Sequence, residues 1–347
     1  MVAVAHDELI AQLTTVWEGV LETHPLGVDD DFFLRGGDSL LAVGLVAELE
    51  RAFGRRLPLD LVLRAPTIGR LAETLRREGD QSPRPAVVPL RGGGSGAEAP
   101  FFVLPGSGGH LFNYYWLARH YGGRRPFYGL QFRGPDEQRA LPRLEDMAAH
   151  FVAEVRALQP EGPYRLGGYS FGGVLAYEMA QQLTAAGQTV ALLALFDSYS
   201  PGFPRPVLML RRLVRHARHV LQAGPSGGLR YICGRLASAA RQVSGAASSP
   251  PNRDARDPEA RARAEFTAAN RRAMHQYVPR PYPGHVVLFR AEIQPQWIGF
   301  DFSDPTLGWG HLVTGRLELV PVPGDHWNLF QEPQVRVLAA QLRDSLG

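Results

Sequence analysis

Apolar residues follow a helical spacing in the first part of the chain. Over residues 7–22 they recur every three or four positions, which predicts an amphipathic helix. The same reasoning predicts a second helix over residues 39–53, after a Gly-Gly turn, and a third over residues 67–77 with Thr67 as its N-cap. We therefore expect residues 6–77 to form a small all-α domain.

From residue 100 onward the spacing changes. Short apolar runs alternate with predicted helices such as residues 144–159 and 170–187. Alternating strands and helices favour a mostly parallel sheet that is covered by helices on both faces. The predicted strands are residues 101–105, 127–132, 164–169, 190–196, 285–291 and 317–322.

Two stretches interrupt this order. Residues 78–98 are rich in Pro, Gly and Ser and predict a linker, although its segment AVVPL is also a candidate first strand of the next domain, residues 99–347. Residues 201–280 are helical and rich in arginine, and we expect them to form a lid inserted over the edge of the sheet. The middle of this lid, GAASSPPNRDARD, has the composition of a disordered segment.

The composition fits a globular protein of two or more domains. The chain has 347 residues, of which 45% are apolar, and no apolar run approaches the roughly 18 residues of a membrane span. The first residues lack the apolar run of a signal peptide, so we expect a cytoplasmic protein without membrane contact. A net charge of +3 gives no reason to expect a nucleic-acid partner. The single cysteine, Cys233, excludes an internal disulfide, and we expect no metal site.

The strongest chemical signal is the segment Gly168-Tyr169-Ser170-Phe171-Gly172, between a predicted strand and a predicted helix. A serine at such a sharp turn needs glycines around it, because larger side chains would clash with the crossing backbone. The turn presents the Ser170 hydroxyl clear of the sheet, and the following helix directs its positive end toward negative charge formed beside it. Ser170 is therefore the candidate nucleophile.

The candidate base is a histidine late in the chain. A serine hydroxyl needs a base to take its proton, and this type of fold has the chain order serine, acid, histidine. His326 directly follows a predicted strand in PVPGDHWNLF, where Gly324 permits a tight loop. His311, in GWGHLVTG, is the competing candidate. His120 and His150 fall on predicted helices, so we expect them to be solvated or packed.

The candidate acid is Asp197. It ends the first predicted strand after the nucleophile helix, and the carboxyl end of a parallel strand is the functional edge of such a sheet. Its alternative role is that of an N-cap or of a turn aspartate before the segment SYSP. The rival acids are Asp301, Asp304 and Asp325.

The oxyanion of the reaction needs two backbone amides. One candidate is the amide of Phe171, the residue after the nucleophile. The other belongs to the loop of residues 105–109, PGSGG, whose small residues allow the backbone to approach a reacting carbonyl. An ordinary glycine turn is the alternative interpretation of this loop.

Residues 100–347 resemble the type I thioesterase domains of nonribosomal peptide and polyketide synthases. The resemblance implies an α/β-hydrolase fold with a helical lid and a triad of Ser170, Asp197 and His326. It also implies that the amide after the loop proline, that of Gly106, is the second oxyanion donor. The matching segments are FFVLPGSGGHLFNYYWLARHY, YRLGGYSFGGVLAYEMAQQL, LLALFDSYSP, MHQYVPRPYPGHVVLFRAE, TLGWGHLVTG and VPGDHWNLFQEP.

The first 77 residues resemble the carrier domains of the same synthases, through DDDFFLRGGDSLLAVGLVAELERAFG. The resemblance implies a four-helix domain whose Ser39 carries covalent 4′-phosphopantetheine, attached by a phosphopantetheinyl transferase. We also expect Ser39 to cap the second helix, where exposed backbone N–H groups suit a phosphodiester. A role as N-cap alone is the alternative.

The expected function is chain release in the biosynthesis of a secondary metabolite such as an antibiotic. An acyl or peptidyl chain would pass from the phosphopantetheine thioester to Ser170 and leave by hydrolysis or macrocyclisation. Because a carrier is charged by upstream synthase domains, we expect the chain to be the C-terminal end of a larger synthase. The alternatives are an esterase or lipase, a freestanding editing thioesterase, and a non-catalytic carrier or docking module.

Charge is distributed unevenly along the chain. Residues 6–77 hold 12 acidic residues and 8 arginines, whereas residues 205–241 hold 8 arginines and no acidic residue. Opposite charge speeds encounter and favours one docking orientation. We therefore expect the basic part of the lid to receive the acidic carrier; a solvated lid face and a membrane-binding helix are the alternatives.

Overall fold

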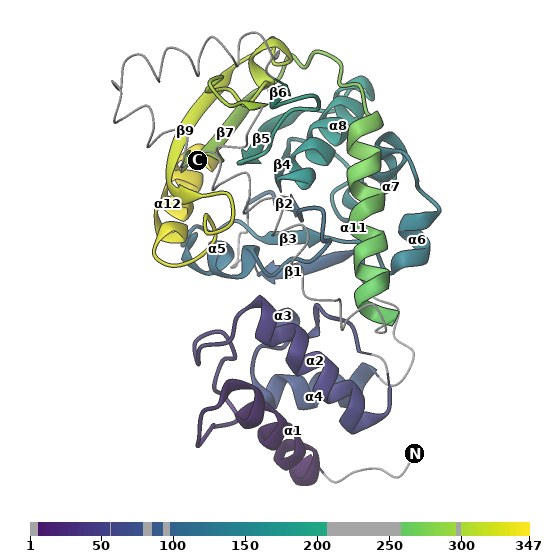
Figure 1. The fold of residues 1–347 in the computed structure, drawn as a ribbon, viewed down its shortest axis with the longest axis vertical. Helices are drawn as coiled ribbons and strands as arrows, with labels where there is room; N and C mark the ends of the chain where they lie inside the picture. The colour runs from purple at the N-terminus through teal and green to yellow at the C-terminus, as the bar shows by residue number, and fades with distance from the viewer. Residues whose placement is uncertain (1–5, 56, 79–84, 93–97, 207–257, 296–299) are drawn as a thin grey trace, which may run out of the picture.

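Four helices form the N-terminal part of the protein in the computed structural model, which describes residues 6–55, 57–78, 85–92, 98–206, 258–295 and 300–347 (Figure 1). They are α1 (His6–Leu21), α2 (Ser39–Phe53), α3 (Leu61–Arg64) and α4 (Ile68–Glu78). The three helices predicted from apolar spacing are present, shifted by one residue or less. The short α3 was not predicted from the spacing, and it completes the four-helix arrangement that the resemblance implies.

The apolar faces of these helices meet in a buried core. Leu13 and Trp17 of α1 are fully buried, and the Trp17 ring meets the Phe32 ring edge-on, with 5.3 Å between the centroids. At the start of α4, the Thr67 hydroxyl accepts a hydrogen bond from the Arg70 amide at 3.3 Å. Thr67 therefore caps this helix as predicted.

The cap of α2 differs from the prediction. The helix begins at Ser39 itself, and the carboxylate of Asp38 accepts a hydrogen bond from the Leu41 amide at 2.8 Å. Asp38 therefore holds the cap position that we had assigned to Ser39. Aspartate and serine cap helices equally well, so the sequence pattern alone does not separate these two neighbours.

A seven-stranded sheet forms the centre of the second part, with the strand order β1-β3-β2-β4-β5-β7-β9. Its neighbouring strands are parallel except for β1, which runs antiparallel to β3, so the predicted mostly parallel sheet is confirmed. The segment AVVPL contributes β1, inside the stretch predicted as linker, and β6 pairs with β8 in a separate two-stranded sheet. The strands are β1 (Val87–Arg91), β2 (Phe101–Leu104), β3 (Phe127–Leu130), β4 (Tyr164–Tyr169), β5 (Val190–Phe196), β6 (Arg205–Pro206), β7 (Val286–Ile293), β8 (Phe300–Asp301) and β9 (Leu317–Asp325).

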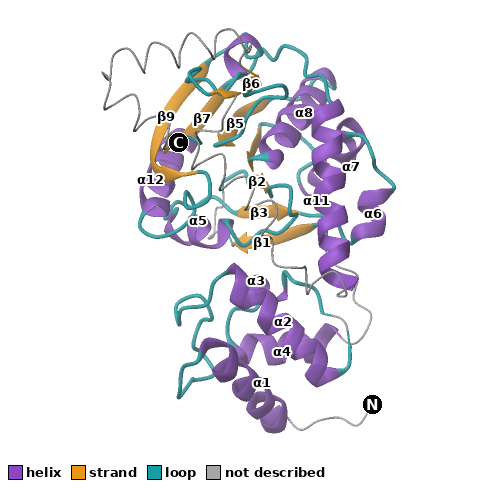
Figure 2. Cartoon of the chain, in the orientation of Figure 1, coloured by secondary structure: helices purple, strands orange, loops and turns teal. Residues whose placement is uncertain are grey.

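Helices cover both faces of the seven-stranded sheet (Figure 2). Alternate residues of β2 point to opposite faces. Phe101 and Val103 join the buried cluster that contains residues of α5 and α12, whereas Phe102 and Leu104 join the cluster of α7, α8 and α11. The helices are α5 (Tyr114–His120), α6 (Pro135–Arg139), α7 (Leu144–Leu158), α8 (Phe171–Ala185), α11 (Pro258–Gln276) and α12 (Gln334–Leu346), with a 3₁₀ helix, η2 (Trp309–His311).

Much of the predicted lid lies outside the described residues. Both α11 and β6 belong to the predicted insertion, but residues 207–257, which hold the segment predicted to be disordered, most of the basic stretch and Cys233, are not described. The same holds for residues 79–84 and 93–97 of the predicted linker.

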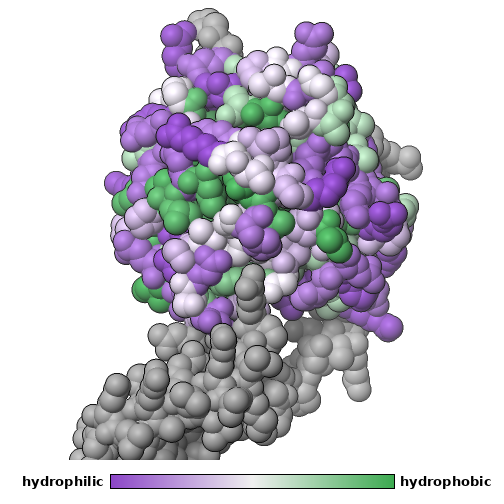
Figure 3. Space-filling model, turned by 90° about the horizontal axis from the view of Figure 1, so that it is seen from above, coloured by the Kyte–Doolittle hydropathy of each residue, from purple (hydrophilic) through white to green (hydrophobic). Residues whose placement is uncertain are grey.

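On the face shown in Figure 3, hydrophilic residues predominate, and hydrophobic residues form several separate patches between them. No helix of the described ranges has the length and the apolar character that are needed to cross a bilayer.

The turn between β4 and α8 is sterically crowded. Ser170 has φ 53° and ψ −118° there, a conformation that residues with a side chain rarely adopt. A Cβ on Gly168 would lie 2.0 Å from the carbonyl oxygen of Gly172, and a Cβ on Gly172 would lie 2.3 Å from that of Leu104. The glycines around the serine are therefore required by backbone contact, as predicted.

Replacing Gly168 by alanine should lower the free energy of unfolding by about 1–3 kcal/mol, because the added carbon forces the backbone to shift. Gly92→Ala adds a carbon that has no neighbour within 4 Å, and it should change the same quantity by less than about 0.5 kcal/mol. Urea denaturation of the two variants measures the difference. Equal stability of the two variants would contradict the steric role of Gly168.

Candidate active site

Three predicted site residues follow the ends of parallel strands. Ser170 follows β4, Asp197 follows β5 and His326 follows β9. Because β4, β5, β7 and β9 run parallel, their carboxyl ends lie along one edge of the sheet. Residues that are far apart in the sequence thus become neighbours at that edge.

Asp197 and His326 are in direct contact. Asp197 Oδ2 lies 2.8 Å from His326 Nδ1, the Asp197 side chain is fully buried, and the His326 side chain is 11% exposed. A buried carboxylate in this position orients an imidazole and stabilises its charged form. The contact uses Nδ1 and so directs proton transfer to the other ring nitrogen, Nε2.

The rival acids bind the backbone of their own loops. In Asp301, Asp304 and Asp325, Oδ1 accepts a hydrogen bond from the amide two residues later, at 3.0, 2.8 and 2.9 Å respectively. Such contacts are typical of aspartates that form turns. Of the four candidate acids, Asp197 is the one that the structure brings to His326.

The other histidines lie elsewhere. His311 ends η2 and is exposed. His120 Nε2 lies 2.5 Å from Glu332 Oε1 at the end of α5, and His150 Nε2 of α7 lies 3.5 Å from Glu137 Oε1. The helical positions expected for His120 and His150 are therefore confirmed.

Gln294 holds the carboxylate of Asp197, and the sequence patterns did not reveal it. Asp197 Oδ1 accepts hydrogen bonds from the Ala291 amide and from Gln294 Nε2, both at 3.0 Å. Gln294 is itself fixed, because Nε2 also donates to the Ala291 carbonyl at 2.8 Å and Oε1 accepts from Tyr199 Oη at 3.1 Å. One carboxylate oxygen is thereby occupied, and the other faces His326.

Aromatic rings hold the His326 loop. Tyr169 Oη donates to the His326 carbonyl at 2.6 Å, and its ring centroid lies 4.8 Å from that of the imidazole. The Tyr199 ring stacks on the imidazole, with 5.7 Å between the ring centroids. Burial raises the pKa of both tyrosines and the Asp197 carboxylate raises it further, so both phenols remain protonated donors. Gly324, at φ 100°, makes the tight turn expected before the histidine.

Two hydrogen bonds connect the backbone of Ser170 to the segment that carries Asp197. The Ser170 amide donates to the Phe196 carbonyl at 3.2 Å, and the Ser198 hydroxyl donates to the Ser170 carbonyl at 2.7 Å. The residue before Ser170 is the tyrosine that packs on the imidazole. The structure therefore gathers the predicted nucleophile, acid and base in one region.

The two predicted oxyanion amides lie beside the same turn. Phe171 opens α8, and the first amides of a helix have no intrahelical acceptor. Gly106 follows Pro105, whose carbonyl oxygen would lie 2.4 Å from a Cβ on Gly172. A Cβ on Gly106 would lie 3.1 Å from the Tyr169 ring. Both amides thus belong to backbone that converges on the serine turn.

Asn270 of α11 holds the predicted oxyanion loop and was not identified from the sequence. Its Nδ2 donates to the Ser107 carbonyl at 2.9 Å, and its Oδ1 accepts from Gln138 Nε2 at 3.1 Å. Asn270 is 1% exposed; its contact with Gln138 is buried and its contact with the Ser107 carbonyl is partly buried. Phe266, one helical turn earlier, lies against Gly109, where a Cβ would be 2.4 Å from its ring. The last helix of the insertion therefore packs on this loop.

A family model for the thioesterase domain matches residues 99–345. The chain belongs to the thioesterase domain family. A second model, the phosphopantetheine attachment site, matches residues 11–75 and indicates a covalently attached 4′-phosphopantetheine. Both resemblances stated from the sequence are confirmed. We therefore call residues 99–345 the thioesterase domain and residues 6–78 the carrier region.

The curated relatives are nonribosomal peptide synthases and related enzymes. A dimodular nonribosomal peptide synthase of Bacillus subtilis is 32% identical over 339 residues, which cover 94% of this chain and 14% of that protein. The indigoidine synthase of Dickeya dadantii is 40% identical over 196 residues, which cover 56% of this chain and 13% of that protein. The chain thus spans about one seventh of the length of these relatives.

Solved structures support the same architecture. A four-domain nonribosomal peptide synthetase in its holo form, bound to AMP and glycine, aligns with a TM-score of 0.59 at 31% identity over 97% of this chain and 26% of that chain. The NocB thioesterase domain, in covalent complex with a fluorophosphonate nocardicin G analog, aligns with a TM-score of 0.51 at 29% identity over 73% of this chain and 96% of that chain. The α/β-hydrolase fold expected from the sequence is confirmed.

Replacing Gln294 by alanine should lower kcat for thioester hydrolysis about tenfold with little change in KM, because Asp197 loses a hydrogen bond that orients it. The matched control is Gln341→Ala, since Gln341 of α12 is half-buried and its Nε2 donates to the Pro321 carbonyl at 2.9 Å. Steady-state kinetics with a soluble thioester compare the two. An unchanged kcat in the Gln294 variant would exclude this positioning role.

Asn270→Asp should also lower kcat about tenfold, because a carboxylate cannot donate to the Ser107 carbonyl and the oxyanion loop loses its support. Arg272→Ala, an exposed position on the same helix, serves as the control and should leave kcat unchanged. Thermal denaturation of both variants separates a loss of fold from a loss of loop position. The idea fails if kcat of the Asn270 variant stays at the wild-type value.

Proposed function

We propose that the thioesterase domain releases an acyl or peptidyl chain from the phosphopantetheine arm of a carrier, through an acyl-enzyme on Ser170. The observation that carries this proposal is the contact between Asp197 and His326 at 2.8 Å, beside the strained turn that presents Ser170. The carrier region on the same chain supports a tethered thioester as substrate.

Ser39 is the proposed attachment point for the arm. It is the first residue of α2, where helix N–H groups and the helix dipole favour a phosphate. The neighbouring Asp38 caps the helix, so the cap does not depend on the Ser39 hydroxyl. These features fit a serine that is available for modification by a phosphopantetheinyl transferase.

The attached arm would supply the thioester carbonyl on which the residues of the chain act. His326 Nε2 takes the proton of the Ser170 hydroxyl as Ser170 Oγ bonds to the carbonyl carbon. Asp197 stabilises the imidazolium, and the amides of Phe171 and Gly106 donate to the oxyanion. As the carbon–sulfur bond breaks, His326 returns the proton to the leaving sulfur. Ser170 is then acylated.

The second half of the reaction repeats this proton transfer. His326 takes a proton from water or from a hydroxyl or amine of the acyl chain, and the new nucleophile displaces Ser170. Water yields a free acid, and an internal nucleophile yields a macrocycle. The relatives are nonribosomal peptide synthases, which supports upstream synthase domains as the source of the acyl or peptidyl chain in secondary-metabolite biosynthesis.

Two other functions are less well supported. An esterase or lipase would act on a free substrate, for which a carrier region on the same chain has no use. A non-catalytic carrier module would not need a buried carboxylate that orients a histidine beside a strained serine. Editing by a freestanding thioesterase is likewise disfavoured by the carrier region.

Two serine variants test the proposal. Ser170→Ala should abolish release and leave the acyl group on Ser39, whereas Ser39→Ala should prevent attachment of the arm but preserve hydrolysis of a soluble thioester. Intact-mass spectrometry after loading with an acyl phosphopantetheine donor detects each species. Wild-type release by the Ser170 variant would refute the mechanism.

A further inference from the structure

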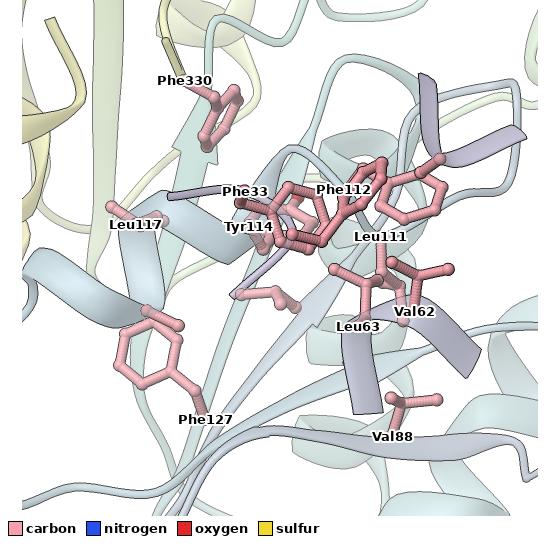
Figure 4. Packing of buried hydrophobic residues seen from close by; sticks show 14 of the residues in the cluster. Phe33, Val62, Leu63, Val88, Leu111, Phe112, Tyr114, Leu117, Phe127 and Phe330 are labelled. Carbon is pink, nitrogen blue, oxygen red and sulfur yellow. The ribbon is translucent and has the colours of Figure 1, made fainter. Parts of the chain in front are cut away.

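Apolar residues of the carrier region and of the thioesterase domain share one buried cluster (Figure 4). From the carrier region, Phe33, Val62 and Leu63 are 5%, 0% and 8% exposed. From the thioesterase domain, Leu111 and Phe112 are 1% and 6% exposed. In Figure 4 these side chains lie close together, with Val88 of β1 beneath them.

An aromatic contact lies at one side of this cluster. The Phe33 ring lies 3.9 Å from the Tyr115 ring and 6.2 Å from the Phe112 ring, between centroids. Phe33 belongs to the loop before α2, whereas Phe112 and Tyr115 belong to the start of α5 and the residues before it. Such pairs add to the stability gained by burial alone.

A polar contact borders the aromatic one. Tyr115 Oη donates to Asp31 Oδ2 at 2.5 Å, and Arg119 lies 3.9 Å from the same oxygen. The other oxygen, Oδ1, accepts from the amides of Phe33 and Leu34 at 3.0 and 3.2 Å. Burial and the Asp31 carboxylate raise the pKa of Tyr115, so its phenol stays protonated and can donate. Asp31 thus shapes its own loop and binds the thioesterase domain at once.

Short stretches of chain and a series of contacts connect this interface to both predicted reaction sites. Phe33 is six residues before Ser39, a separation that spans at most about 20 Å even when extended. The loop between them is compact, because the Gly37 amide donates to the Phe32 carbonyl at 2.9 Å. On the other side, Tyr114 Oη donates to the Leu104 carbonyl at 2.6 Å, and this carbonyl packs on the serine turn.

We propose that residues 31–33 and 62–63 form the surface by which the carrier region docks on its own thioesterase domain, with Leu111, Phe112 and Tyr115 as the receiving surface. By holding the two regions together, this docking favours transfer from the Ser39 arm to Ser170. The inference rests on the proposed function. It differs from the docking predicted from charge, which involved the basic stretch of residues 205–241, since the contact described here is mainly apolar with one carboxylate at its border.

Tyr115 is the best residue for a test, because its side chain contacts the carrier region and is only partly buried. Tyr115→Phe removes the donor to Asp31 and keeps the ring, and Tyr115→Glu adds a carboxylate that repels Asp31. The control for the lost hydroxyl is Tyr164→Phe, whose hydroxyl donates to the carbonyls of Gln159 and Pro160 at 3.0 Å within the thioesterase domain. The control for the added charge is Val278→Glu, at a position that is 80% exposed.

Two rates are measured on the full chain. The first is single-turnover loss of an octanoyl group from the Ser39 arm, and the second is hydrolysis of octanoyl-N-acetylcysteamine in solution. Tyr115→Phe should slow the first rate about tenfold, the effect of losing one hydrogen bond to a carboxylate, and Tyr115→Glu should slow it more. The second rate should stay at the wild-type value in both variants, and both rates should do so in both controls.

Hydrogen exchange provides a second readout. In Tyr115→Glu, amides of residues 29–36 and 110–121 should exchange faster than in the wild type, because the shared cluster opens. The amides of residues 164–185 should exchange at the wild-type rate.

An unchanged rate of octanoyl loss from Ser39 in Tyr115→Glu would overturn the docking proposal. An equal fall in both rates would also overturn it, because Tyr115 would then support the structure of the active site. A wild-type chain that hydrolyses neither substrate would instead refute the proposed function, so the two failures are distinguishable.

Discussion

The close approach of three backbone segments at the end of β4 is the constraint on which the thioesterase site depends. Ser170 holds its positive φ because Gly168 and Gly172 leave room for the carbonyl oxygens of the turn and of Leu104. The same close approach places the start of α8 and the loop after β2 beside the serine turn. Donors that are already in place need no rearrangement during a reaction, which is the condition under which they stabilise an oxyanion most.

Features that depend on local patterns could be predicted from the sequence. The apolar runs predict six strands that are all present, and their parallel arrangement brings Ser170, Asp197 and His326 to one edge. The preference for Asp197 over Asp325 also follows from position. Neighbouring side chains of an extended chain point in opposite directions, so Asp325 is turned away from His326 and accepts from the amides of its own turn, whereas Asp197 at the end of another strand reaches the imidazole.

Contacts between distant segments that belong to no motif could not be predicted. Gln294 and Asn270 belong to no motif, and each acquires its role only because strand pairing or helix packing brings it to a partner more than 90 residues away. The prediction of Ser39 as the cap of α2 was wrong for a different reason. Asp38 and Ser39 are equally suited to the cap position, and only the observed start of the helix distinguishes them. The contact of Phe33 with Tyr115 likewise joins two segments with no shared pattern.

The attachment of α11 to the predicted oxyanion loop couples the position of this helix to that of the loop. Phe266 and Asn270 of this helix contact the loop after β2. A helix moves largely as a rigid body, so a tilt of α11 would shift Asn270. The Ser107 carbonyl that Asn270 binds would shift with it, and so would the neighbouring Gly106 amide. A displacement of α11 would therefore change the turnover of a substrate more than its affinity.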